Sequence, residues 1–162
     1  MNKKKTFNLG FTLIELLVVI SLIGILSALA LVSFTGAQKQ ARDSQRKSDL
    51  KQYQTAVEGF ANKNNGFYPA RNDEPEGVSF VSTICSLVEL SSCTEDPRYT
   101  SDNTFYYHYQ SDVAADGTIT ATKYVLWAKL ENTTNYWVNC SNGRAGTKAQ
   151  TGFDVSGGVC PL

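Results

Sequence analysis

The feature that most constrains this sequence is an apolar stretch over residues 11–34, which carries one charged residue, Glu15. A helix rises 1.5 Å per residue, so about 20 residues cross the ~30 Å hydrocarbon core of a bilayer. Lys3, Lys4 and Lys5 precede the stretch, and no basic residue follows it immediately. This asymmetry favours a single pass with a cytoplasmic N-terminus. The stretch is therefore either a retained transmembrane helix or a secretory signal.

Glu15 bears on the choice between these two readings. A secretory signal needs a small-residue cut site, and Ala28-Leu29-Ala30 offers one. An ionised carboxylate in the membrane costs on the order of 2–3 kcal/mol, which a discarded signal has no reason to carry. A cut after Gly10 would instead create a cationic amine on Phe11, four residues from the carboxylate. At ~4 Å and an effective dielectric of about 20, the two charges attract by roughly 4 kcal/mol. Between chains, the same pair would set the register of one helix against the next.

The residues at this junction, Gly10-Phe11-Thr12-Leu13-Ile14-Glu15-Leu16, resemble the leader junction of type IV pilins and type II secretion pseudopilins. The resemblance is close over residues 1–36 and looser as far as residue 69. It implies that residues 1–10 are a leader removed by a prepilin peptidase. It also implies that Phe11 becomes N-methylated and that Glu15 directs assembly.

The resemblance implies a structural role, as a type IV pilus subunit rather than an enzyme, with no cofactor, metal or catalytic residue. The precursor is expected in the inner (cytoplasmic) membrane. The mature chain is expected in a homo-oligomeric helical filament, at the cell surface or in the periplasm, together with an assembly platform and minor pilins. Residues 11–36 would form the hydrophobic filament core. One alternative is a pseudopilin of a type II secretion system. Another is a secreted binding domain that never polymerises, which requires a cut after Ala30.

The helix is expected to continue beyond the membrane over residues 37–66. No proline interrupts this segment, and its apolar residues recur at spacings of three and four, as on one face of a helix. Asn64-Asn65-Gly66 is a suitable helix stop. The predicted helix therefore runs from Thr12 to about Lys63. Its apolar stripe consists of Leu50, Tyr53, Val57 and Phe60, while Arg46, Lys47, Lys51 and Glu58 are expected elsewhere on the helix.

Residues 67–162 are expected to form a C-terminal globular region with a small antiparallel sheet. A sheet of this kind needs one face covered, and the apolar stripe is the candidate cover. The fold class is therefore α+β, a long N-terminal helix packed on a three-stranded meander. The predicted elements are a loop over residues 70–79, a short helix over 82–90, strands over 104–110, 119–130 and 136–140, and turns at Asp116-Gly117 and 131–134.

Four cysteines, Cys85, Cys93, Cys140 and Cys160, all lie in the C-terminal half. An even number in an exported domain indicates two disulfides and an oxidising compartment. Four cysteines allow three connectivities, of which we favour the local pairs Cys85–Cys93 and Cys140–Cys160. The second pair would clasp residues 141–162, a Gly/Ser/Thr-rich tail expected to be floppy alone. Zinc is disfavoured because no C-x-x-C pair occurs and His108 is the one histidine.

Several other polar groups are interpreted as structural. The formal net charge is zero, so no basic field would attract nucleic acid, and no specific nucleic-acid partner is predicted. His108 is expected to be a structural or surface residue. Asp154 alone does not supply the six to eight oxygens of a calcium site. The remaining candidates are an acidic turn (Asp73, Glu74, Glu76), tyrosines in sheet packing (Tyr106, Tyr107, Tyr109) and a weak glycosylation triplet (Asn132-Thr133-Thr134).

Overall fold

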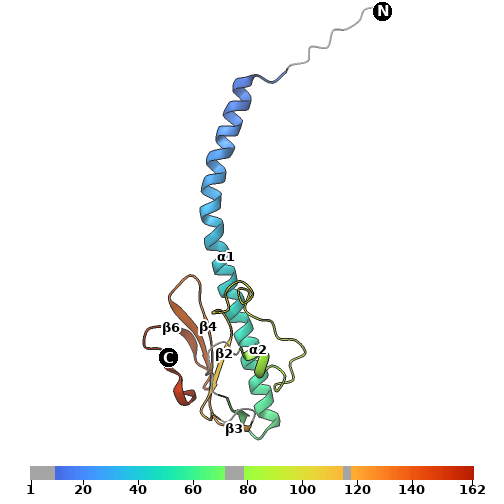
Figure 1. The fold of residues 1–162 in the computed structure, drawn as a ribbon, viewed down its shortest axis with the longest axis vertical. Helices are drawn as coiled ribbons and strands as arrows, with labels where there is room; N and C mark the ends of the chain where they lie inside the picture. The colour runs from blue at the N-terminus through green and yellow to red at the C-terminus, as the bar shows by residue number, and fades with distance from the viewer. Residues whose placement is uncertain (1–9, 72–78, 115–117) are drawn as a thin grey trace, which may run out of the picture. The chain divides into compact units, whose positions relative to one another are not determined.

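The computed structural model describes residues 10–71, 79–114 and 118–162, without the side chains of residues 30–33. Contacts divide the chain into two units, residues 1–38 and 39–162, which are described separately (Figure 1). Most of the predicted leader therefore lies outside the described residues. The same holds for the predicted acidic turn (Asp73, Glu74, Glu76) and the predicted turn at Asp116-Gly117.

Helix α1 spans Leu13–Lys63. It ends where the sequence predicts, because the backbone turns into the left-handed region at Asn65 (φ 55°) and Gly66 (φ 84°). The Gly66 N–H reaches back to the Ala61 carbonyl at 2.8 Å, which satisfies one of the last free carbonyls of the helix. The part of α1 from residue 39 onward belongs to the second unit.

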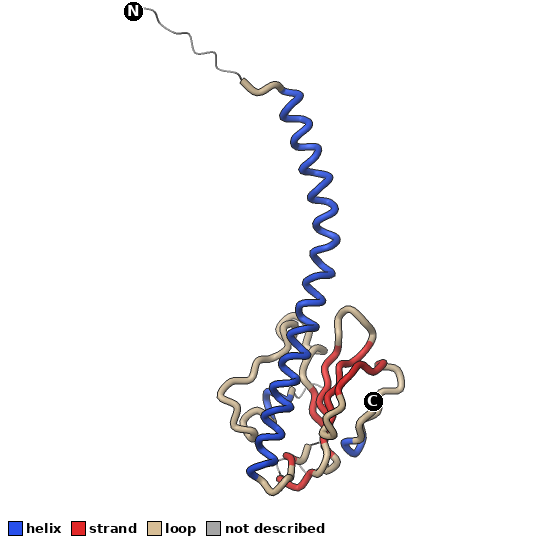
Figure 2. The backbone as a smooth tube through the Cα atoms, turned by 180° about the vertical axis from the view of Figure 1, so that it is seen from behind, coloured by secondary structure: helices blue, strands red, loops and turns tan. Residues whose placement is uncertain are grey.

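The second unit combines this part of α1 with two antiparallel sheets, which confirms the α+β class (Figure 2). The larger sheet has the order β2-β4-β5-β6, and the smaller one pairs β1 with β3. The elements after α1 are β1 (Tyr68–Pro69), α2 (Phe80–Thr83), β2 (His108–Ser111), β3 (Ile119–Ala121), β4 (Tyr124–Lys129), β5 (Asn135–Cys140), β6 (Ala145–Ala149) and the 3-10 helix η1 (Ser156–Gly158).

One face of the larger sheet packs on α1, as predicted. Leu50, Tyr53 and Val57 are buried in this interface and Phe60 is partly buried against it. Burial of such side chains contributes roughly 1.5–3 kcal/mol each. The aromatic rings interlock, and Tyr53 stacks on Phe80 with ring centroids 4.6 Å apart. The sheet supplies Tyr109, Tyr124, Leu126 and Ala128 to this core, and Tyr107, which directly precedes β2, adds its ring.

The opposite face of the sheet is covered by the C-terminal tail, which the sequence analysis did not predict. Val125, Trp127, Val138 and Cys140 form the buried part of this second core. Successive residues of β4 point to opposite faces, so the strand contributes to both cores. The tail packs on it through Phe153, Val155, Cys160 and Leu162.

The tail is also more ordered than expected, because residues 145–149 form strand β6. Asn142-Gly143 makes the turn between β5 and β6, with Gly143 at φ 83° and its N–H donating to the Cys140 carbonyl at 3.0 Å. The Cys140 N–H in turn donates to the Arg144 carbonyl at 2.9 Å. Asn-Gly between two strand-forming runs is a strong hairpin signal, and pairing of β6 with β5 orders the tail in addition to the predicted Cys140–Cys160 clasp.

Two strand predictions were wrong in their bounds. The expected single strand over residues 119–130 is broken, because the N–H groups of Thr122 and Lys123 donate to the Asp112 carboxylate at 2.9 and 3.2 Å. The expected strand over residues 104–110 begins only at His108, and the Tyr107 carbonyl accepts from the Phe80 N–H at 2.7 Å. Side-chain and loop contacts thus interrupt what local β propensity favours.

The short helix α2 begins two residues before the predicted helix over residues 82–90 and ends earlier. Ser79 fixes its start, because the Ser79 hydroxyl accepts from the Val81 N–H at 3.1 Å. Turns follow, and Glu89 adopts a left-handed conformation at φ 55°. The bonds Cys85–Cys93 and Cys140–Cys160 are both formed, the local pairing favoured above.

Candidate assembly site

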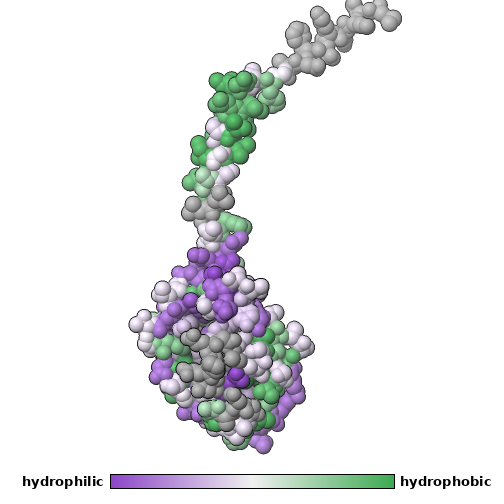
Figure 3. Space-filling model, viewed as in Figure 1, coloured by the Kyte–Doolittle hydropathy of each residue, from purple (hydrophilic) through white to green (hydrophobic). Residues whose placement is uncertain are grey.

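The first unit presents an apolar surface with no cover of its own (Figure 3). Its described large apolar side chains range from 47% exposed at Val18 to 87% exposed at Phe11. Among the described residues, α1 is the one helix with an apolar stretch long enough to cross a membrane, judged by length and composition. A surface of this size needs a lipid or protein partner, because soluble monomers rarely expose large contiguous apolar patches.

Thr12 and Glu15 form a capping box at the start of α1. The Glu15 carboxylate accepts from the Thr12 N–H at 2.8 Å and from the Thr12 hydroxyl at 2.7 Å. The Thr12 hydroxyl in turn accepts from the Glu15 N–H at 3.3 Å. This reciprocal pattern satisfies free donors of the first helical turn. The carboxylate therefore already has two donors within its own chain.

Gly10 and Phe11, the predicted cleavage and methylation positions, lie outside the helix and are exposed. A Cβ atom at Gly10 would meet nothing within 4 Å in the described structure. The fold around Gly10 therefore imposes no need for glycine there. Any such requirement has to come from an external partner.

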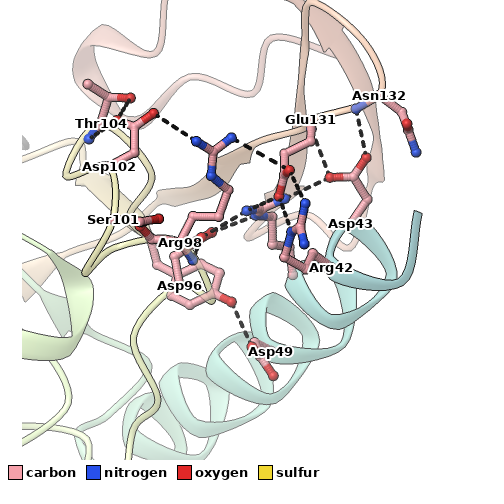
Figure 4. A network of polar contacts seen from close by, with 12 residues as sticks. Arg42, Asp43, Asp49, Asp96, Arg98, Ser101, Asp102, Thr104, Glu131 and Asn132 are labelled. Carbon is pink, nitrogen blue, oxygen red and sulfur yellow. Dashed lines mark hydrogen bonds and ion pairs between the residues drawn. The ribbon is translucent and has the colours of Figure 1, made fainter. Parts of the chain in front are cut away.

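A buried ion cluster in the second unit ties α1 to the connection before β2 and to the β4–β5 turn (Figure 4). Arg46 lies at the centre of this cluster, and its side chain is fully buried. This differs from the sequence-based expectation, which placed Arg46 away from the helix face that packs on the sheet. Its guanidinium contacts Asp96 at 2.6 Å, Asp43 at 2.8 Å and Glu131 at 2.8 Å. Removing one partner of such a cluster leaves a buried charge without compensation, which is strongly destabilising. The cluster therefore fixes how these segments of the second unit are arranged.

Glu131 is bound from two sides of this cluster. Arg42 donates to both of its oxygens, at 2.7 and 2.6 Å, and Arg46 makes the third short contact. Hydrogen bonding to Arg42 and the charge of Arg46 lower the pKa of the Glu131 carboxyl to about 2, against the opposing effect of burial. The backbone of the turn is held as well, because the Glu131 N–H donates to Asp43 at 2.8 Å.

The outer face of the sheet and the tail enclose a cleft of about 650 Å³. His108 lies in its wall, stacked on Trp127 with ring centroids 4.7 Å apart and near Tyr106 at 3.9 Å. These contacts give His108 a structural role in the wall, and the buried tyrosines Tyr107 and Tyr109 lie in the core facing α1. Within the described ranges, no group of three or more His, Cys, Asp or Glu side chains is placed to hold a metal ion.

The structure thus separates the predicted site residues into distinct groups. Gly10, Phe11 and Glu15 lie together at the start of α1, while the four cysteines hold two loops of the second unit. Sequence reasoning missed Thr12 as the partner of Glu15, although a Thr-x-x-Glu spacing is a known capping signal. It also missed Arg46, whose partner Asp96 lies 50 residues away and leaves no local signal.

Comparison with known proteins supports this placement of the site. Residues 7–31 match the family model described as the prokaryotic N-terminal methylation motif. The chain is 38% identical over 66 residues to the type IV major pilin protein PilA of Myxococcus xanthus (strain DK1622), covering 41% of this chain and 30% of that protein. It is 35% identical over 85 residues to fimbrial protein Q of Moraxella bovis, covering 51% of this chain and 52% of that protein.

These matches confirm the resemblance to type IV pilins that the junction residues indicate. The chain spans about half or less of the length of these curated relatives. No solved structure matches it.

Proposed function

We propose that this chain is a structural subunit of a type IV pilus, cut after Gly10 and assembled through residues 11–36. The observation that carries the proposal is a coincidence of two features on one segment. Residues 7–31 match the N-terminal methylation motif, and the described apolar side chains of the same segment are exposed. An apolar helix of this kind is stable first in a bilayer and then against other copies of itself.

Processing supplies the charge that Glu15 requires in the assembled state. Cleavage by a prepilin peptidase frees the Phe11 amine, which N-methylation leaves cationic. The carboxylate of a neighbouring copy then pairs with this amine, and the pair sets the axial register between helices. Before this pairing, the N–H and hydroxyl groups of Thr12 donate hydrogen bonds to the carboxylate. Assembly of this kind is structural and requires no catalytic residue in the chain itself.

The precursor is placed in the inner membrane with its N-terminus in the cytoplasm. Three lysines before the apolar stretch support this orientation. The second unit is then outside the cytoplasm, where Cys85–Cys93 and Cys140–Cys160 can form. An assembly platform extracts the subunit from the bilayer, and minor pilins join the same filament.

A pilus is preferred over a secretion pseudopilus because both curated relatives are named as pilus or fimbrial proteins. Electron microscopy of native cells separates the two, since a pilus gives long extracellular fibres that contain this chain. Fibres confined to the periplasm would contradict the choice of a pilus.

Mass spectrometry of the mature N-terminus in the native host is the first test. The expected result is a chain that begins at N-methylated Phe11. A chain that begins at Leu31 would overturn the proposal, because the apolar stretch would then be a discarded signal.

The assembly role is tested with Glu15→Ala, which we expect to be processed but to form no fibres. Glu89→Ala is the matched control, because the Glu89 carboxylate is exposed and pairs with Lys63 in the second unit, away from the start of α1 in the sequence. Normal fibre yield from Glu15→Ala would contradict the pairing of Glu15 with Phe11.

A further inference from the structure

The second unit contains a small cationic pocket beside the β4–β5 turn. Its volume is about 340 Å³, within the range of small-ligand sites. Residues from α1, the connection before β2, the end of β4 with its turn, and the end of β6 converge on it. The lining residues that bear on its chemistry are Lys39, Arg98, Lys129, Glu131, Thr133 and Thr134, beside the Phe105 ring.

The positive charge of this pocket is not neutralised by its own carboxylate. Glu131 is engaged by Arg42 and Arg46 at 2.6–2.8 Å, whereas Arg98 lies 3.6 Å from it. Among the described residues, neither Lys39 nor Lys129 forms an ion pair, although the charge of Lys129 helps to lower the pKa of the Asp102 carboxyl, which lies 3.4 Å from Arg98. Lys129 Nζ lies instead 4.9 Å from the centroid of the Phe105 ring. The pocket therefore has two ammonium groups available for an anion.

The turn adds neutral donors to these cations. Thr133 and Thr134 are exposed and line the pocket, and in the described part of the chain their hydroxyls make no hydrogen bond. Ammonium groups beside hydroxyls match the oxygens of a phosphate group, which accepts several charge-assisted hydrogen bonds. The chemistry of the pocket is thus that of a phosphate site.

Chain connectivity limits where the pocket meets its ligand. Lys39 follows the apolar stretch by five residues, and five helical residues rise about 7.5 Å. In a membrane-inserted precursor, Lys39 therefore leaves the bilayer at the level of the lipid headgroups. Anionic headgroups attract nearby basic residues by about 1 kcal/mol each, which is about fivefold in affinity.

We propose that this pocket binds the phosphate of an anionic phospholipid, such as phosphatidylglycerol, at the membrane surface. The inference rests on the proposed membrane-inserted precursor. A zwitterionic headgroup fits less well, because its quaternary ammonium would meet Lys39 and Lys129. The pocket keeps the second unit at the bilayer until the subunit is extracted.

The test uses the full chain in a neutral detergent, titrated with dihexanoyl-phosphatidylglycerol or dihexanoyl-phosphatidylcholine. Amide NMR shifts of Thr133 and Thr134 report occupancy. Lys39→Gln and Lys129→Gln are each expected to weaken phosphatidylglycerol binding about fivefold. Lys123→Gln is the matched control, because Lys123 directly precedes β4 and Lys129 ends it, about 20 Å away at 3.3 Å per strand residue. The control is expected to bind like the parent chain.

Three results would overturn the proposal. The first is equal weakening by Lys123→Gln and Lys129→Gln, which would indicate a general charge effect. The second is equal binding of the two lipids. The third is binding of inorganic phosphate as tight as that of phosphatidylglycerol, which would make the pocket a free-anion site. Binding is measured on the isolated chain, so its outcome is independent of filament formation, the readout for the proposed function.

Discussion

Arg46 and Asp96 form a two-point ion pair in the interior of the second unit. Arg46 Nε lies 2.6 Å from Asp96 Oδ2, and Arg46 Nη2 lies 2.8 Å from Asp96 Oδ1. The side chains are 0% and 1% exposed. The pair joins α1 to a connection 50 residues later, so it holds a contact that local sequence does not encode.

Asp96→Asn is expected to lower the free energy of unfolding of the second unit by about 3–5 kcal/mol, because Arg46 keeps a buried charge with one partner fewer. Urea unfolding of the full chain in neutral detergent, followed by tryptophan fluorescence, measures this loss. Lys63→Met is the control, since the Lys63–Glu89 pair is exposed and its loss should cost less than about 1 kcal/mol. Equal losses in the two variants would show that the buried pair contributes no more than a surface one.

The stability of the second unit is expected to fall as the pH is lowered from about 4.5 to about 2. The Glu131 pKa is lowered from 4.5 to about 2 in the folded chain by Arg42 and Arg46. The folded chain thus binds a proton less readily than the unfolded chain, and acid shifts the balance toward unfolding. The size of the effect is about 3 kcal/mol.

Glu131→Gln is expected to remove this component of the pH dependence. Urea unfolding at a series of pH values, in the parent chain and the variant, provides the comparison. If the variant lost as much stability at low pH as the parent chain, that loss would have to come from other carboxylates.

Gly158→Ala is expected to destabilise the second unit more than Gly152→Ala. Both glycines have positive φ, 62° and 69°, so both substitutions carry backbone strain of order 1–3 kcal/mol. At Gly158 the added Cβ would also lie 2.7 Å from the Asp112 nitrogen, whereas at Gly152 it would meet nothing within 4 Å. The difference in unfolding free energy between the two variants measures the cost of disturbing this close approach of the tail to the end of β2. No difference would mean that the tail moves away at no cost.

Loss of the Cys140–Cys160 bond is expected to destabilise the chain more than loss of Cys85–Cys93. The bonds close loops of sequence separation 20 and 8. By loop entropy the longer one contributes about 0.8 kcal/mol more. The double Cys→Ala variants, compared by urea unfolding, measure the difference, and the reverse order would indicate that packing of the tail outweighs loop entropy.

Thr12→Val is expected to loosen the first turn of α1, because it removes the hydroxyl from the capping box. A lost cap costs about 1 kcal/mol, so the protected amides of that turn should exchange about fivefold faster in micelles. Thr12→Ser keeps the hydroxyl and is expected to exchange like the parent chain. Equal exchange in all three chains would contradict a capping role.

The helix and its packed stripe were predictable because they rest on local patterns. Apolar periodicity identified Leu50, Tyr53 and Val57, and Asn65-Gly66 marked the stop. Arg46 was misplaced because a charged side chain is ordinarily expected in water. The distant carboxylates of Asp96 and Glu131, together with the neighbouring Asp43, compensate its burial.

The strand bounds and the second core depended on contacts that propensity does not describe. Asp112 divides residues 119–130, which favour a single strand, into β3 and β4, and the tail that covers Trp127 follows β6, the partner of β5. Of the site, the residues at the junction were identified from the motif alone. The cationic pocket was not, because its residues come from four separate segments.

The capping box at the start of α1 changes how the driving force of polymerisation should be understood. Both hydrogen bonds from Thr12 end on Oε2 of Glu15, so the cap orients the carboxylate while Oε1 accepts no hydrogen bond within the described residues. The chain therefore presents one free, already oriented carboxylate oxygen to the amine of another copy. The apolar side chains around Val18 supply affinity in many alignments, and this oriented oxygen decides which alignment is accepted.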